Sequence, residues 1–295
     1  MPTRTEASLA AADLAGRTFF ITGATAGIGR AVAQGLAARG ATLIIGARSV
    51  AKADETVRSL GQLYPRAQFS IVPLDLSSLA SVRDAAGRVL ASGRPIDVLI
   101  NNAGRRAGRG GTTADGFDVT IETNHVGPFL LTEMLLPALT AAPQGRIVNV
   151  ASRAHRRVRR FAWGALARPP RVHGGFFIYG MSKLMNVLHA KELARRLAGT
   201  RITTYSLHPG VVASDFWRDL SAPLQWLLKL RMISNEEGAL TPLYCATAPE
   251  LSTTSGRYYA RCREVQPSRL ALDAGLAREL YDRTEAAIQS VPPDR

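Results

Sequence analysis

The sequence predicts a single α/β domain, in which a doubly wound, parallel seven-stranded sheet carries helices on both faces. Short apolar runs alternate with segments of helical spacing along most of the chain, which is the pattern of right-handed strand–helix–strand units. The apolar runs are continuous rather than alternating, as expected for strands buried on both faces. No repeat or linker interrupts the 295 residues, so we expect one domain over 1–295.

The first unit illustrates how each element is predicted. RTFFIT at 17–22 is a short apolar run followed by a glycine-rich turn, and the segment 28–40 has apolar residues at helical spacing and ends in glycine. The same reasoning gives strands at 17–22, 41–47, 67–76, 96–104, 145–152, 201–210 and 256–260. Helices are expected between the early strands, at about 115–141 and 176–199, near 235–248, and in a C-terminal segment 261–295.

Composition limits the class of protein. Hydrophobic residues make up 46% of the chain, which excludes disorder of the whole chain. No apolar run reaches the roughly 18 to 20 residues that a membrane-spanning helix needs, and the first residues lack the apolar segment of a secretory signal. Cys245 and Cys262 are too few for a disulfide framework or a zinc site, and the five histidines are scattered. We therefore expect no metal and a cytoplasmic location.

The formal net charge is +14, with a dense arginine-rich stretch at 153–171. Such a charge fits nucleic acid, an acidic membrane surface or a phosphorylated ligand, and it also fits a solvated loop. One alternative is therefore a non-catalytic binding protein that uses 153–171 for nucleic acid or acidic partners. We do not expect a nucleic-acid partner, because a complete set of candidate catalytic residues is present.

The glycine-rich turn TGATAGIG at 22–29 joins the first strand to the first helix. Gly23 permits the tight turn, Gly27 lets the backbone approach a pyrophosphate, and Gly29 lets the helix pack close to the strand. The helix N-terminus then points at the phosphate. A purely structural turn is the alternative, but the position between a strand and a helix favours a dinucleotide site.

Three motifs in order, TGxxxGxG, NNAG at 101–104 and YGMSK at 179–183, resemble the short-chain dehydrogenase/reductase family. The resemblance runs from about Phe19 to Tyr259. It implies a Rossmann domain and an oxidoreductase that transfers a hydride between a nicotinamide cofactor and an alcohol or carbonyl. The stretches at 191–199 and 203–212 resemble the retinol-dehydrogenase-like branch.

The end of the second strand bears on the choice of cofactor. A carboxylate there would bind the ribose hydroxyls of NAD, but Ala47 provides none and the cationic Arg48 follows it. A cation favours a 2′-phosphate, so the sequence predicts NADP(H) rather than NAD(H). A solvated surface arginine is the alternative.

The resemblance implies further cofactor contacts. Asp75 and Leu76 would hold the adenine, although Asp75 is also consistent with a helix cap. Pro209 and Gly210 make a turn after the sixth strand, which without the other motifs could be a simple loop. The full set of cofactor-binding residues is Gly23, Thr25, Ala26, Gly27, Ile28, Gly29, Arg48, Asp75, Leu76, Asn101, Ala103, Gly104, Tyr179, Lys183, Pro209, Gly210, Val212 and Ser214.

Tyr179 and Lys183 share one face of a helix because they are four residues apart. A free tyrosine has a pKa near 10, and we expect the nearby ammonium to lower it, so that Tyr179 serves as acid and base near neutral pH. Ser152 ends the fifth strand, where ligands of α/β sheets bind, and would hydrogen-bond the substrate oxygen. Asn124 matches the family's asparagine that steadies a proton-relay water. A helix start that happens to carry Tyr179 and Lys183 is the alternative.

The rest of the chain is assigned more coarsely. We expect 15–150 to be mainly the cofactor half and 151–260 the catalytic and substrate half. The segment 215–235 is apolar and predicts a substrate lid, with ordinary core packing or peripheral membrane contact as alternatives. Its candidate substrate contacts are Phe216, Trp217 and Trp226. The resemblance also implies a homo-oligomer formed through the helices at 115–141 and 176–199, although a monomer is not excluded.

Overall fold

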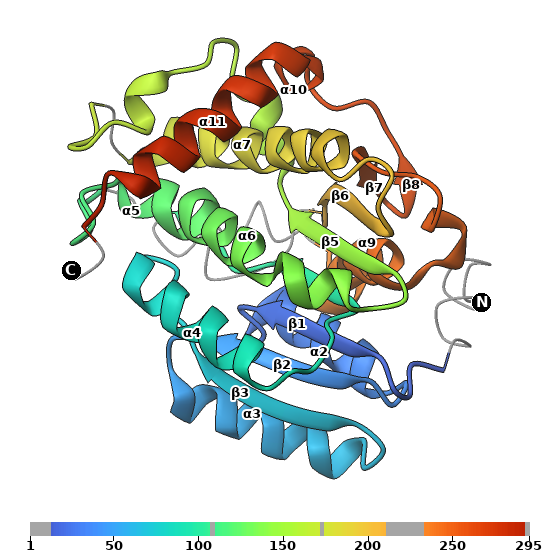
Figure 1. The fold of residues 1–295 in the computed structure, drawn as a ribbon. Coiled ribbons are helices and arrows are strands. Elements are labelled where there is room, and N and C mark those ends of the chain that lie inside the picture. The colour runs from blue at the N-terminus through green and yellow to red at the C-terminus, as the bar shows by residue number, and fades with distance from the viewer. Residues whose placement is uncertain (1–12, 107–109, 172–173, 211–232, 293–295) are drawn as a thin grey trace, which may run out of the picture.

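The computed structural model describes residues 13–106, 110–171, 174–210 and 233–292 (Figure 1). These residues contain one sheet with the strand order β3-β2-β1-β4-β5-β6-β7-β8. Its strands are β1 (Thr18–Thr22), β2 (Thr42–Ala47), β3 (Gln68–Pro73), β4 (Val98–Asn101), β5 (Gly145–Val150), β6 (Ile202–His208), β7 (Arg257–Ala260) and β8 (Arg263–Glu264). Neighbouring strands are parallel except β7 and β8. The predicted doubly wound α/β fold is confirmed.

Helices follow most strands. The longer ones are α2 (Gly27–Ala37), α3 (Val50–Leu63), α4 (Leu79–Ala91), α6 (Gly127–Thr140), α7 (Gly175–Arg196), α9 (Asn235–Thr247) and α11 (Ala274–Gln289). Short turns of helix are α5 (Val119–Ile121), the π-helix η1 (Glu122–Val126), η2 (Arg153–Arg157), η3 (Trp163–Ala165), η5 (Pro249–Leu251) and α10 (Arg269–Leu272). None of the described helices is both long and apolar enough to cross a membrane.

Within the described residues the sheet has eight strands, where the sequence predicted seven. The additional strand β8 pairs antiparallel with β7 after a two-residue turn at Arg261 and Cys262. Both residues of β8 are exposed. A two-residue exposed strand has no apolar run, so the pattern that predicted the other strands could not reveal it.

One predicted helix begins later than expected. The region 115–141 contains α5, η1 and α6, which run without a break from Val119 to Thr140. Asp118 ends the preceding loop, because its Oδ1 accepts hydrogen bonds from the backbone N–H groups of Thr120 at 2.8 Å and Ile121 at 3.3 Å. This side-chain cap fixes the start of the helix.

The strand order marks the carboxyl end of β1 as the expected ligand site of a doubly wound sheet. Chain order reverses there, because β1 pairs with β2 on one side and with β4 on the other. Connections from neighbouring carboxyl ends then leave in opposite directions, which opens a space where ligands of doubly wound sheets bind.

Two helical layers cover the sheet, and alternate residues of each strand face opposite layers. Phe20 of β1 belongs to the core cluster formed with α4, α6, α7 and α11. Phe19 and Ile21 belong to the cluster formed with α2, α3 and α9. Figure 1 shows α11 lying outside α7, farther from the sheet than the other helices of its layer.

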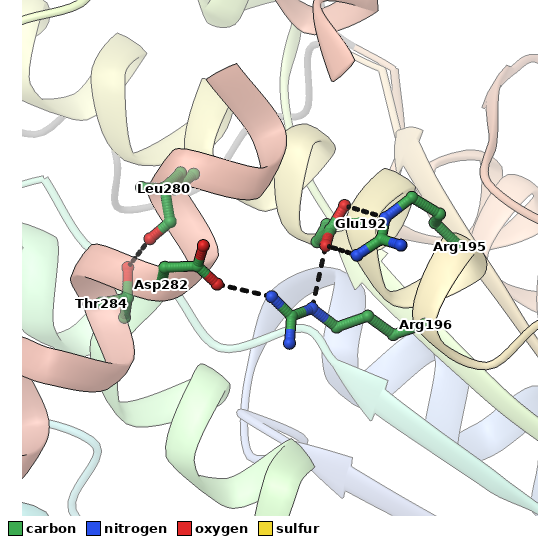
Figure 2. Close-up of polar contacts among 6 residues, drawn as sticks. All are labelled: Glu192, Arg195, Arg196, Leu280, Asp282 and Thr284. Atoms are coloured by element: carbon green, nitrogen blue, oxygen red, sulfur yellow. Dashed lines mark hydrogen bonds and ion pairs between the residues drawn. The ribbon is translucent and has the colours of Figure 1, made fainter. Parts of the chain in front are cut away.

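Charged contacts fasten the C-terminal helix α11 to α7 (Figure 2). The buried Glu192 accepts hydrogen bonds from Arg195 at 2.6 Å and Arg196 at 2.9 Å. Arg196 also binds Asp282 of α11 at 2.5 Å, and its guanidinium lies 3.7 Å from the ring centroid of Tyr281. α11 therefore occupies part of the face that the sequence predicted as a subunit interface.

Candidate active site

The glycine-rich turn has the geometry that the sequence predicted. Gly23 has φ +71°, and a Cβ atom there would lie 2.8 Å from Cα of Ala103. A Cβ atom on Gly29 would collide with the carbonyl oxygen of Gly23. No side chain caps the start of α2, where Ala26 is the N-cap residue. The first-turn N–H groups of α2 are thus left for a ligand anion, as a pyrophosphate site requires.

Two further residues hold this turn, and the sequence reasoning did not identify them. The side-chain amide of Asn102 donates to the carbonyl oxygens of Thr22 at 2.9 Å and Gly23 at 3.2 Å. The hydroxyl oxygen of Thr22 accepts from the backbone N–H groups of Asn102 at 3.1 Å and Ala103 at 3.0 Å. The position of Asn102 within NNAG was the available signal.

Asn101, which precedes this pair, has a different role in the fold. Its buried side-chain amide donates to Thr132 of α6 at 3.0 Å and to Asn149 of β5 at 2.9 Å. These bonds join β4 to its neighbours in the sheet and helical layers. Any cofactor contact of Asn101 would therefore come from its backbone.

The carboxyl end of β2 carries the predicted cation. Ala47 is buried, whereas Arg48 is exposed, and Ser49 caps α3 by accepting from the backbone N–H of Lys52 at 3.4 Å. At the next strand, Oδ1 of Asp75 accepts from the hydroxyl of Ser77 at 2.6 Å. The alternative that Asp75 caps a helix is wrong, because Ser78 is the residue that caps α4.

Asn124, Lys183 and the backbone beside Gly104 meet near the carboxyl ends of β4 and β5. The Lys183 ammonium donates to the carbonyl oxygen of Val150 at 2.8 Å. Asn124 donates from Nδ2 to the hydroxyl of Ser182 at 2.9 Å. A Cβ atom on Gly104 would lie 3.1 Å from Nζ of Lys183 and 3.4 Å from Oδ1 of Asn124, so the glycine gives these two side chains room beside the backbone.

Asn124 is held on both sides by the backbone of Arg105. Its Oδ1 accepts from the N–H of Arg105 at 2.8 Å, and its Nδ2 donates to the carbonyl oxygen of Arg105 at 2.9 Å. Asn124 lies in the π-helix η1, a local widening that often occurs at functional sites. The amide orientation is thus fixed before any ligand binds.

Tyr179 stands at the centre of the predicted reaction site. Burial raises its pKa to about 12, while a hydrogen bond with Ser152 and the charge of Arg106 act to lower the pKa. Burial also lowers the pKa of Lys183 to about 8. The structure thus brings Ser152, Tyr179 and Lys183 together at one edge of the sheet.

The expected electrostatic role of Lys183 needs correction. The groups of the protein that lower the pKa of Tyr179 are Ser152 and Arg106, not Lys183. The Lys183 ammonium is bonded to Val150 and lies 5.8 Å from the centroid of the Tyr179 ring. In the protein by itself, the Val150 carbonyl therefore holds the Lys183 ammonium near the Tyr179 ring.

The region after β6 is described only in part. Pro209 and Gly210 follow the strand, and Gly210 has φ +110°, where a Cβ atom would collide with Ile233. The cofactor residues Val212 and Ser214, the substrate residues Phe216, Trp217 and Trp226, and most of the expected lid 215–235 lie outside the described residues.

Several arginines of the basic stretch are engaged within the protein. Arg168 donates to the backbone oxygen of Asp115 at 2.7 Å, and Arg156 donates to that of Gln266. Arg157 lies 5.7 Å from the ring centroid of Phe176. These contacts fasten the stretch to the domain, which weakens the alternative of a free basic patch for nucleic acid.

Comparison with known protein families identifies the family of this chain. The sequence profile of the family described as short chain dehydrogenase matches residues 17–167, just over half of the chain. The chain is a short-chain dehydrogenase/reductase. As the resemblance implied, it is therefore an oxidoreductase that uses a nicotinamide dinucleotide and acts on alcohols or carbonyls.

Curated relatives place this short-chain dehydrogenase/reductase in the retinol-dehydrogenase-like branch. It is 40% identical over 282 residues to dehydrogenase/reductase SDR family member 13 of Bos taurus, covering 92% of this chain and 73% of that protein. It is 39% identical over 272 residues to retinol dehydrogenase 12 of Homo sapiens, covering 92% of this chain and 85% of that protein.

Solved structures agree on the fold. A putative uncharacterized protein from Mycobacterium paratuberculosis is 33% identical with a TM-score of 0.75, and the match covers 95% of this chain and 97% of that one. Pseudomonas aeruginosa RhlG, solved as an active-site complex with NADP, is 26% identical with a TM-score of 0.68, and the match covers 90% and 98% of the two chains.

Proposed function

We propose that this short-chain dehydrogenase/reductase prefers NADP(H) and interconverts a hydrophobic alcohol and its carbonyl, with Tyr179 as the acid and base. The observation that carries the proposal is the meeting of Ser152, Tyr179 and Lys183 at the carboxyl end of β5, beside the point where strand order reverses. A hydroxyl, a phenol and a buried ammonium together suit proton transfer to and from a substrate oxygen.

The cofactor would lie across the carboxyl end of β1. The uncapped N-terminus of α2 and the backbone of Gly23 to Gly29 fit its pyrophosphate. Exposed Arg48 at the end of β2 supports a 2′-phosphate, and Asp75 with Leu76 would hold the adenine. The remaining predicted contacts are Thr25, Ala26, Ile28, Asn101, Ala103, Gly104, Pro209, Gly210, Val212 and Ser214.

When bound, NADP(H) supplies or accepts the hydride. In the reductive direction the Tyr179 hydroxyl donates its proton to the substrate oxygen, while Ser152 hydrogen-bonds the same oxygen and stabilises the charge that develops there. Lys183 contributes a cation beside the phenol, and Asn124 is fixed by Arg105 in a position to hold a water near it. In the oxidative direction Tyr179 accepts the proton.

The substrate class rests on similarity. Relatives named retinol dehydrogenase share 36 to 39% identity with most of this chain, which supports an extended apolar alcohol or aldehyde. The apolar segment 215–235 supports the same class through the predicted lid with Phe216, Trp217 and Trp226. The division into a cofactor half at 15–150 and a catalytic half at 151–260 stays a prediction. So do the cytoplasmic location and the peripheral membrane contact.

The test is a panel of aldehydes, ketones, quinones and retinoids, each assayed with NADPH and with NADH. We expect turnover of apolar aldehydes or retinoids, and higher kcat/KM with NADPH. Turnover of small polar carbonyls alone would overturn the substrate class. No turnover of any compound, with no binding of either cofactor, would overturn the proposed function.

A further inference from the structure

His155 lies three residues after Ser152, in η2, and is completely buried. Its Nδ1 lies 2.6 Å from the carbonyl oxygen of Ser152, and its Nε2 lies 3.1 Å from the backbone nitrogen of Ser268. A carbonyl oxygen only accepts and a backbone N–H only donates. Nδ1 must therefore carry the proton while Nε2 accepts, so only one neutral tautomer of His155 satisfies both bonds.

The ring joins two distant parts of the chain. Ser152 follows β5, whereas Ser268 directly precedes α10. The edge-to-face contact of His155 with Tyr258 of β7, at 5.0 Å between ring centroids, holds the imidazole from a third side. The hydrogen bond from Arg156 to the backbone oxygen of Gln266 provides a second link between the same two segments.

The position of η2 also bears on Tyr179. η2 packs against α7 at Gly180, where a Cβ atom would lie 3.1 Å from the carbonyl oxygen of Ala154. Gly180 directly follows Tyr179, and Ala154 directly precedes His155. A shift of η2 would therefore move Ser152 and the start of α7 relative to one another.

We propose that His155 is a positioning residue, whose neutral imidazole holds the Ser152 turn in register with Tyr179 by bridging it to Ser268. The inference rests on the proposed function for its kinetic consequence. A displacement of about 1 Å in a catalytic group can reduce turnover about 10²-fold, so such a bridge has a measurable effect on rate.

The charges around the ring favour this neutral form. Burial lowers the pKa of His155, with the Ser152 carbonyl opposing and Arg156 reinforcing that shift. Neighbouring groups from other elements are His208 of β6 and Tyr258 of β7. Arg153 of η2 and Arg261 of the turn after β7 in turn act on His208. Because the pKa is lowered on folding, the unfolded chain takes up the proton first, and the bridge loses stability as pH falls below the ordinary value of 6.5.

The bridge itself is tested without any substrate. In ¹⁵N-histidine NMR spectra, with His155→Phe used for assignment, we expect His155 to show a protonated Nδ1, an unprotonated Nε2 and a pKa below the ordinary value of 6.5. In His155→Phe, the backbone amides of 152–158 and of the first turn of α7 should be protected from hydrogen exchange about tenfold less, or weaker still, than in the wild type. An Nε2–H tautomer, titration near pH 6.5, or unchanged exchange would overturn the inference.

The consequence is tested with the best substrate of the panel and NADPH. His155→Phe should lower kcat about 10- to 100-fold, with KM and the NADPH Kd within about twofold. His155→Asn, which can still donate to Ser152, should recover part of the loss. The control variant is His189→Gln. His189 is also a buried histidine, but it lies on α7 and outside the bridge, so kcat should stay within about threefold of the wild-type value. Wild-type kcat in His155→Phe would overturn the positioning role, whereas absence of turnover in the wild type would count against the proposed function and leave the exchange result to decide the bridge.

Discussion

Lys183 is a buried ammonium whose pKa falls from 10.5 to about 8 because burial disfavours its charge. Below pH 8 the ammonium is charged in both the folded and the unfolded chain, and its burial costs on the order of 3 kcal/mol. Between about pH 8 and 10.5 the unfolded chain binds the extra proton, so the free energy of unfolding rises with pH over that range.

We therefore expect Lys183→Met to raise the free energy of unfolding at pH 7 by about 1 to 3 kcal/mol while abolishing turnover. Urea unfolding at pH 7 and pH 10 measures this. The advantage of the variant should shrink at the higher pH, where the wild-type lysine is already neutral in the folded state. An equal difference between the two proteins at both pH values would contradict the buried charge.

Arg48 is the residue on which the proposed cofactor preference rests. Arg48→Ala should weaken NADPH binding by about 1 to 3 kcal/mol, the usual range for a charge-assisted phosphate contact, and leave NADH binding unchanged. Fluorescence titration with both cofactors measures it. Arg88→Ala, which removes an exposed arginine of α4 paired with Asp84, is the control and should change neither affinity. A wild type that binds both cofactors equally would show that Arg48 is a solvated surface residue.

A residue of the candidate site could be predicted from the sequence where its side-chain chemistry itself indicates a role. Ser152, Tyr179 and Lys183 were predicted because a hydroxyl, a phenol and an ammonium at strand ends and helix spacing point to proton transfer. Thr22 and Asn102 could not be predicted in the same way, since they act on the backbone of the glycine-rich turn. The direction in which the Lys183 ammonium points depends on the Val150 carbonyl, which no local pattern reveals.

At the scale of elements, the β7–β8 hairpin turns through two non-glycine residues in the left-handed region. Arg261 has φ +52° and Cys262 has φ +56°. Turns with two such residues match the twist of a hairpin and favour asparagine and glycine. Left-handed backbone disfavours residues that carry a Cβ atom. The hairpin therefore holds backbone strain at both positions.

Cys262→Gly should raise the free energy of unfolding by about 0.5 to 1 kcal/mol, because glycine relieves the left-handed conformation by more than it loses in chain entropy. Gly256→Ala is the matched control, because it removes a glycine from a position with positive φ instead of introducing one. It would place Cβ at φ +73° and 2.9 Å from Cβ of Ala194, and should destabilise the protein. Thermal unfolding of both variants measures this. Destabilisation by Cys262→Gly would mean that the Cys262 side chain packs more favourably than the turn is strained.

A helix or strand could be predicted from the sequence where the same apolar spacing repeats over several helical turns or over a whole strand. The helix expected at 176–199 is α7, Gly175–Arg196, within three residues at each end. The helix expected at 115–141 begins four residues late because Asp118 caps it and Thr112 pairs with Asp118 in an isolated bridge. Such caps and bridges depend on contacts that apolar spacing does not encode.

At the scale of the molecule, α11 covers α6 and α7, the helices through which an oligomer was expected. Tyr281 packs against Phe129 of α6 at 4.8 Å between ring centroids, and Thr284 lies 3.0 Å from Nε2 of His125. A partner subunit could reach the part of this face that lies under α11 only by displacing that helix. We therefore expect any oligomer to use another surface.

This expectation about the oligomer surface is tested by hydrogen exchange of α6 and α7 at two protein concentrations about 100-fold apart. Light scattering at the same concentrations measures the oligomeric state. Protection of both helices should be independent of concentration. Tyr281→Ala should lower the free energy of unfolding by about 3 kcal/mol, as expected for removing a buried aromatic side chain. Protection of α6 and α7 that appears only when the chain oligomerises would contradict the covering role of α11.

Tyr179→Phe tests the central claim most directly, because it removes one hydroxyl and leaves the ring to pack. The proposed phosphate site at α2 does not include this hydroxyl, so NADPH should bind with a Kd within about twofold of wild type. Turnover of the best substrate should fall about 10²- to 10⁴-fold, the range for losing a general acid and base. A folded variant that binds NADPH and turns over that substrate at close to the wild-type rate would contradict the assignment of Tyr179 and, with it, the proposed mechanism.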